Sequence, residues 1–235
     1  MKTITLTFLL TLSTSLLFAH SLWIETAAKG KIGQSQSVKL YFGEFAQDER
    51  DELSKWRSDL PSLTLWLIAP DGQKTQLETK QGGNVVESAF TPQKDGVYTL
   101  LVSHKLKDLS GGTGLLEFSA STNVSVGTTV APEANLNTNE IKALPVGATK
   151  VNSPLKIKVW VKGENKAGGT VLVFSPNKWA QELTTDGDGS VTFTPLWPGK
   201  YVVEATNFNN VPGSVGAINY KTFWQGATYS FEVNK

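Results

Sequence analysis

Hydrophobic and polar residues alternate over short segments along most of the chain, and clusters of Gly, Asn, Asp and Pro separate these segments. Alternation with a period of two is typical of half-buried β-strands, and the clusters are typical of turns. In the first half, the pattern predicts seven strands, at 21–26, 37–42, 63–69, 74–78, 85–90, 97–104 and 115–121. Seven short strands are the number found in an immunoglobulin-like sandwich.

Two local motifs refine this prediction. Pro70-Asp71-Gly72 is typical of a tight turn between strands. Asp95-Gly96-Val97-Tyr98 is similar to the tyrosine corner of immunoglobulin-like domains, in which a Tyr near the start of the sixth strand bonds to backbone; an ordinary turn is the alternative. The charged stretch 47–59 is more polar and fits one or two helical turns.

The second half shows the same alternation. It predicts strands at 155–162, 170–174, 181–185, 190–194, 199–205 and 228–233, with a hairpin turn at 186–189. Between the halves, 123–150 has weak periodicity and several Asn and Pro, which indicates a connecting segment. We therefore expect an all-β fold of two antiparallel β-sandwich domains in tandem, at 20–122 and 151–235.

The N-terminus has the pattern of a secretory signal over residues 1–19. Lys2 supplies the positive charge, 6–18 the apolar run, and Ala19 a small residue at the cleavage site. Later segments lack the roughly 20 apolar residues that a membrane span needs. We expect an exported mature chain that begins at His20, without a membrane span.

Composition narrows the chemistry further. The chain has no Cys, which excludes disulfides and thiolate sites. Its 22 basic and 21 acidic residues give no electrostatic footprint for nucleic acid. No Ser-His-Asp or Cys-His arrangement is recognisable, and we expect no enzymatic activity.

The two histidines are the candidate metal ligands. In an up-and-down sandwich the start of the first strand and the end of the sixth lie at one end, so His20 and His104 can meet there. The free α-amine of His20 and the two imidazoles would then form a three-nitrogen set suited to Cu(II), and also to Ni(II) or Zn(II). Glu44 is a candidate oxygen ligand, whereas alternation directs Glu25 away. The alternative is that His20 reflects only the cleavage site and that His104 is an ordinary strand-end residue.

Two resemblances extend this prediction. The run 168–174, the segment 183–193 and Pro198-Gly199-Lys200-Tyr201 resemble the transthyretin-like module called the carboxypeptidase regulatory-like domain, which implies a non-catalytic sandwich over 153–235. With the mature start at 20–25 and Tyr41-Phe42-Gly43-Glu44, the whole chain resembles bacterial periplasmic proteins described as a nickel-transport-complex subunit or a periplasmic component of cobalt transport. Members often carry further histidines near the C-terminus, and 219–224 has none.

These observations lead to a functional hypothesis and an alternative. We expect a periplasmic protein that binds a divalent transition metal (copper, nickel or cobalt) through His20, His104 and Glu44 and passes it to an envelope transporter. The alternative is a non-catalytic structural, interaction or carbohydrate-binding protein of the cell envelope. A third possibility, an oxidative copper enzyme acting on polysaccharide, shares the same nitrogen ligands but needs a flat substrate face.

Overall fold

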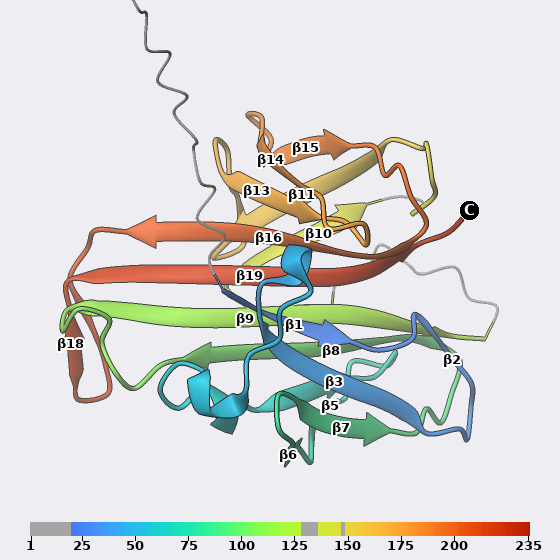
Figure 1. The fold of residues 1–235 in the computed structure, drawn as a ribbon, viewed down its shortest axis with the longest axis horizontal. Helices are drawn as coiled ribbons and strands as arrows, with labels where there is room; N and C mark the ends of the chain where they lie inside the picture. The colour runs from blue at the N-terminus through green and yellow to red at the C-terminus, as the bar shows by residue number, and fades with distance from the viewer. Residues whose placement is uncertain (1–19, 128–135, 147–148) are drawn as a thin grey trace, which may run out of the picture.

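The computed structural model describes residues 20–127, 136–146 and 149–235, and these are almost entirely β-structure (Figure 1). The helical segments in this part of the chain are three short 3-10 turns: η1 (Phe45–Gln47), η2 (Leu53–Lys55) and η3 (Leu60–Ser62). Of these, η2 lies within the charged stretch 47–59 in which helical turns were expected, and η1 and η3 lie at its two ends. None of the described helices has the length or the apolar character to cross a bilayer. The all-β prediction is confirmed.

The first half forms a sandwich of two sheets. One sheet has the order β1-β3-β7-β6, and the other has the order β9-β8-β4-β5. The side chains that alternate inward from the two sheets form one continuous apolar core, which includes Leu40, Leu100 and Phe118. The strands are β1 (Ser21–Glu25), β2 (Lys29–Gly30), β3 (Gln36–Gly43), β4 (Leu65–Ile68), β5 (Lys74–Leu77), β6 (Lys80–Gln81), β7 (Val86–Phe90), β8 (Gly96–Lys105) and β9 (Gly114–Val126).

The second half repeats this arrangement. β11 pairs with β10, β12 and β15, and a facing set of strands has the order β14-β13-β16-β19. A second apolar core, including Ile157, Val173 and Tyr201, lies between them. The strands are β10 (Ile141–Val146), β11 (Leu155–Val161), β12 (Glu164–Asn165), β13 (Thr170–Phe174), β14 (Ala180–Thr184), β15 (Ser190–Phe193), β16 (Gly199–Asn209), β17 (Gly213–Val215), β18 (Ile218–Tyr220) and β19 (Thr222–Val233).

The segment 123–150, expected to be a connection, contributes to both halves. Its first residues continue β9 as far as Val126, and Ile141–Val146 forms β10. β10 pairs antiparallel with β11, with Ile141 opposite Val161, and buries Ile141 and Ala143. The pattern did not predict this strand because it is short and contains Pro145, which is tolerated at a sheet edge. β10 is such an edge.

One continuous sheet joins the two halves. β9 and β19 pair in parallel, from Thr222 opposite Gly114 to Ser230 opposite Thr122. This pairing fuses the strands into a nine-stranded sheet, β14-β13-β16-β19-β9-β8-β4-β5, with β2 beside β9. Figure 1 shows the two long strands side by side through the middle of the molecule.

Strand β1 is held between the two halves, and this fixes the position of the residues at its start. Leu22 and Ile24 point into the first core. Trp23 points the other way and is fully buried against Phe174 and Val202 of the second half. The Thr228 hydroxyl donates a 2.5 Å hydrogen bond to the carbonyl of Leu22. β1 therefore has a defined position on both of its faces.

The tyrosine corner is confirmed, and it occurs twice. The Tyr98 hydroxyl donates to the carbonyl of Lys94 and accepts from the backbone N–H groups of Gln93 and Lys94, each at 3.1 Å. In the second half the Tyr201 hydroxyl donates to the carbonyl of Trp197 at 3.1 Å and accepts from its N–H at 3.2 Å. Each Tyr fixes the turn that precedes its own strand.

Candidate functional site

His20 lies beside the end of β3 because of the pairing between β1 and β3. Ser21 stands opposite Gly43, so the residue before Ser21 comes next to the residue after Gly43. The His20 side chain is 36% exposed, and its ring packs on Phe42 with centroids 5.6 Å apart. His20 is thus a surface residue with one face on the first core.

Two carboxylates flank the His20 ring. Nδ1 lies 3.8 Å from Glu44 Oε1, and Nε2 lies 3.3 Å from Asp51 Oδ2. The first distance is too long for a hydrogen bond, whereas the second is within reach of one. Glu44, a candidate oxygen ligand in the sequence, thus lies beside His20, and Asp51 was not among the predicted ligands.

The loop after β3 brings these two carboxylates together. The backbones of Glu44 and Glu49 bond to each other in both directions, at 3.2 and 3.1 Å, and Asp51 N–H donates to the carbonyl of Phe42 at 2.9 Å. Gly43, at φ +149°, closes the loop, and a Cβ there would lie 2.4 Å from the carbonyl oxygen of Glu49. The loop thus returns to β3 and places Asp51 and Glu44 on either side of the His20 ring.

This geometry suits one tautomer of a metal-ligating His20. In the tautomer with its hydrogen on Nε2, the imidazole can donate to the carboxylate of Asp51, and Nδ1 keeps a lone pair. That lone pair then faces Glu44 across the 3.8 Å gap. Two electron-rich atoms facing each other at this distance can hold a cation between them. A carboxylate on the other ring nitrogen is the arrangement that orients metal-ligating histidines.

Glu25 belongs to a different cluster, as the alternation of β1 predicted. Its Oε1 accepts from Trp23 Nε1 at 2.9 Å and from Arg50 Nη2 at 3.0 Å, and its Oε2 lies 3.7 Å from Lys200 Nζ. Arg50 also pairs with Asp48. Glu25 is therefore already neutralised by two cations.

His104 has a separate carboxylate partner. It lies at the end of β8 with its side chain 14% exposed, and its Nε2 is 3.2 Å from Asp59 Oδ2 without aligned hydrogen-bond geometry. Burial works against the charged form of Asp59. The pKa of this carboxyl nevertheless lies below its usual value because the backbone N–H of Lys107 and the charges of His104 and Lys107 stabilise the anion. Asp59 thus holds the end of β8 against η3.

The structure places both histidines at one end of the first sandwich without a shared partner. His20 packs on Phe42, Phe42 packs on Phe118, and Phe118 stands opposite His104 in the β8–β9 pairing. Within residues 20–127, 136–146 and 149–235, no three His, Asp or Glu side chains converge in a geometry that could hold a metal. A metal ion at His20 would therefore need a ligand other than these side chains, such as the backbone nitrogen of His20.

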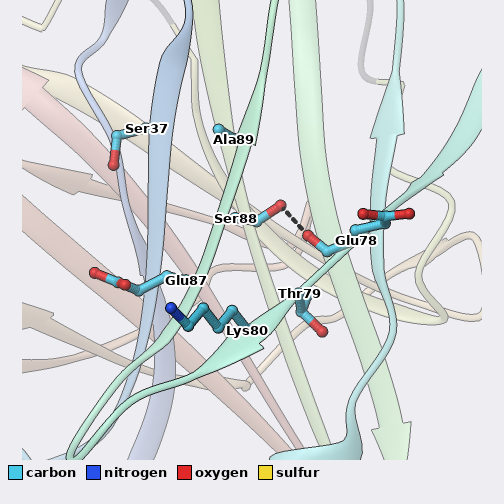
Figure 2. Close-up of a pocket in the computed structure, with 7 residues that line it drawn as sticks. All are labelled: Ser37, Glu78, Thr79, Lys80, Glu87, Ser88 and Ala89. Carbon is cyan, nitrogen blue, oxygen red and sulfur yellow. Dashed lines mark hydrogen bonds between the residues drawn. The ribbon is translucent and has the colours of Figure 1, made fainter.

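A hollow elsewhere in the first half offers no comparable chemistry. It has a volume of about 440 Å³ and lies between β3, β7 and the β5–β6 connection, where the Ser88 hydroxyl donates to the Glu78 carbonyl at 2.7 Å (Figure 2). Its wall is polar and contains Lys80 and Glu87 but no aromatic or histidine side chain. We assign no site to it.

The fold and the His20 cluster define an all-β protein of two fused sandwiches with one histidine between two partly buried carboxylates. The chain belongs to the family described as Domain of unknown function (DUF4198), whose model matches residues 17–208. The match includes His20, Glu44, Asp51 and His104. No curated protein matches the chain.

Comparison with solved structures finds distant likeness only. A DUF4785 family protein from Legionella pneumophila is 13% identical with a TM-score of 0.32, covering 77% of this chain and 52% of its own. A tetra-tandem repeat from the extending region of a large adhesion protein is 11% identical with a TM-score of 0.29, covering 92% and 50%. A two-domain fibronectin type III segment of chicken tenascin is 12% identical with a TM-score of 0.26, covering 86% and 95%. The chain spans about half the length of the first two structures.

Proposed function

We propose that the exported form of this protein binds one divalent transition-metal ion, of the copper, nickel or cobalt class, at His20. Removal of residues 1–19 would give His20 a free α-amine, which chelates together with its own Nδ1. Glu44 would add an oxygen ligand, and Asp51 would orient the ring from Nε2. The observation that carries the proposal is the pair of contacts on the His20 ring, Nε2 on Asp51 at 3.3 Å and Nδ1 facing Glu44 at 3.8 Å.

This ligand set revises the role of His104. In the sequence-based hypothesis His104 is a third nitrogen ligand, but its Nε2 contacts Asp59 and it would have to leave that contact to join His20. We therefore propose His20 and Glu44 as the first ligands. The set that includes His104 remains the alternative within the same function.

The bound ion would be cargo rather than a catalytic cofactor. With the His20 side chain 36% exposed, a partner can reach the ion directly, as transfer to an envelope transporter requires. The resemblance to periplasmic components of nickel and cobalt transport supports the same role. Amine and imidazole nitrogens with one carboxylate suit Cu(II) and Ni(II) more than Mg(II) or Ca(II).

Isothermal titration of Cu(II), Ni(II) and Co(II) tests this proposal, using exported protein whose start at His20 is verified by mass spectrometry. We expect one-to-one binding with a submicromolar Kd for at least one metal. Acetylation of the His20 α-amine should abolish this binding because it removes one of the two chelating nitrogens. Glu44→Gln should weaken it at least tenfold, whereas Glu49→Gln, in the same loop, should not change it.

His104→Ala separates the two ligand sets, with the fold checked by its thermal midpoint. Retained affinity supports the His20–Glu44 set, and lost affinity supports the set with both histidines. Absence of binding by correctly processed protein would overturn the metal proposal and favour a structural or interaction protein of the envelope.

A further inference from the structure

A second hollow, which we call the Asn207 hollow, lies in the second half, outside the His20 cluster. It has a volume of about 470 Å³ and lies between the β11–β12 hairpin, the end of β16 and the start of β19. Asn207, Tyr220 and Phe223 contribute to its wall. Its volume falls within the range of roughly 300–1,000 Å³ that is typical of small-ligand sites.

A row of buried polar side chains runs across the central sheet to this hollow. Asn207 stands opposite Gln225 in the β16–β19 pairing, and Gln225 stands opposite Glu117 in the β19–β9 pairing. Asn207 Nδ2 donates to Gln225 Oε1 at 3.0 Å, and Gln225 Nε2 donates to Glu117 Oε2 at 2.7 Å. The three residues are at most 4% exposed. Neighbouring pairs thus form a continuous hydrogen-bonded row.

The carboxylates of Glu117 and Glu140, at the end of the row away from the hollow, determine how the side-chain amides of Gln225 and Asn207 are oriented. Carboxylate oxygens accept hydrogen bonds, and Gln225 Nε2 faces Glu117 and also Glu140 Oε2, at 3.3 Å. The Ser103 hydroxyl donates to the other oxygen of Glu117 at 2.5 Å. Gln225 must therefore turn its oxygen to Asn207, and Asn207 must turn its NH2 group to Gln225.

The consequence is an oriented acceptor at the hollow. Because Nδ2 of Asn207 donates to Gln225, its Oδ1 is free to accept a hydrogen bond. Among the described residues, no donor bonds to this Oδ1. A buried polar side chain whose orientation is fixed in this way is already organised to receive a ligand donor. The position calls for a hydroxyl or another N–H or O–H group.

Two aromatic residues, Tyr220 and Phe223, also line the hollow. The rings of Tyr220 and Phe223 lie 5.7 Å apart at 48°. Tyr220 packs against Gly213, where a Cβ would lie 2.4 Å from the Tyr220 hydroxyl oxygen. The charges around the hollow are mixed, Lys162 and Lys166 with Glu164, and do not select an anion strongly.

We propose that the Asn207 hollow binds a neutral saccharide of one or two rings. A sugar hydroxyl would donate to Asn207 Oδ1, and the C–H face of the ring would pack on Tyr220 and Phe223. Aromatic surface with a few oriented polar groups is the combination that small-ligand sites use for orientation and specificity. This inference does not depend on the metal proposal, since no residue is shared between the two sites.

Amide ¹H–¹⁵N NMR of the full exported chain tests the proposal, with cellobiose, maltose and diacetylchitobiose each titrated to 20 mM. We expect at least one sugar to shift amides in 161–166, 207–213 and 220–223 and not those near His20. Asn207→Ala should weaken this binding at least tenfold. Glu117→Gln should weaken it as well, because an amide at position 117 can donate as well as accept and so no longer fixes the orientation of the Gln225 and Asn207 side chains. Asn219→Ala, outside the hollow, should leave the binding unchanged.

The Glu117 variant keeps the proposal testable if Asn207→Ala does not fold, since Gln has nearly the shape of Glu. No localised shift with any of the three sugars would overturn the proposal. Shifts that both Asn207→Ala and Glu117→Gln leave intact would overturn it too, because the ligand would then bind without the oriented amide.

Discussion

At the scale of single residues, Glu204 has an unusual environment. This carboxyl group lies on β16 and is 2% exposed, and no described residue donates a hydrogen bond to its Oε2. Burial raises its pKa from an ordinary 4.5 to about 7, and the hydroxyl of Ser21 on β1 opposes this rise only in part. The folded protein therefore favours the neutral acid.

The raised pKa predicts a loss of stability as the pH increases. Below the unfolded pKa both states hold the proton, whereas between about 4.5 and 7 only the folded state does, so the free energy of unfolding falls across this window. At about 1.4 kcal/mol per pKa unit, the penalty reaches roughly 3 kcal/mol by pH 8. Glu204→Gln should remove it, stabilising the protein at pH 8 with little effect at pH 4.5. Urea unfolding at both pH values measures this, and an equal effect at both would contradict it.

The candidate site shows how far single residues could be predicted. His20 could be proposed because the expected export signal makes it the first residue of the mature chain, and Glu44 could be proposed only as a candidate oxygen ligand. Asp51 and Asp59 could not, because in the sequence both lie among other charges and resemble a solvated surface. Their contacts with His20 and His104 depend on how the loops after β3 and before β4 fold back.

At the scale of elements, the two halves use the same device before equivalent strands. Tyr98 in β8 and Tyr201 in β16 each bond the backbone four residues earlier. Each follows a glycine with positive φ, Gly96 at +132° and Gly199 at +127°. A Cβ at Gly96 would lie 2.6 Å from the side chain of Pro70, and a Cβ at Gly199 would lie 3.2 Å from that of Pro176. These glycine–proline contacts connect the start of each strand to the turn that follows its neighbouring strand.

Removing either hydroxyl should destabilise the protein. We expect Tyr98→Phe and Tyr201→Phe each to lower the free energy of unfolding by about 1–2 kcal/mol, because backbone groups lose a bonded partner while the ring still fills its place. Tyr41→Phe is the control, with an expected change within about 0.5 kcal/mol. Denaturant titration of the three variants tests this. If Tyr98→Phe and Tyr201→Phe lower the free energy of unfolding no more than Tyr41→Phe does, the hydroxyl bonds of the corners do not stabilise the protein.

At the scale of the whole molecule, the parallel pairing of β9 with β19 makes both cores depend on one sheet. β1 adds a second connection, since its two faces contact different halves through Leu22 and Trp23. Neither half can open without breaking these shared contacts. The two cores should therefore unfold together.

Differential scanning calorimetry tests this cooperativity. We expect one transition with equal calorimetric and van't Hoff enthalpies. Trp23→Ala should lower stability by about 3–5 kcal/mol because it leaves a cavity between the halves, whereas Phe208→Ala, at a ring 62% exposed, should change it little. Two resolved transitions in the wild-type protein would contradict the prediction.

The alternation of apolar and polar residues by itself determined the all-β class and the location of most strands, because each strand needs only its own side chains to specify a buried face. The tertiary structure decided where strands extend beyond the predicted segments to polar residues such as Asn207 and Gln225, since these are buried only through hydrogen bonds to neighbouring strands. It also decided the parallel junction of β9 and β19, the strand β10, and which carboxylate each histidine contacts. These features join residues far apart in the chain, and a local pattern carries no information about such partners.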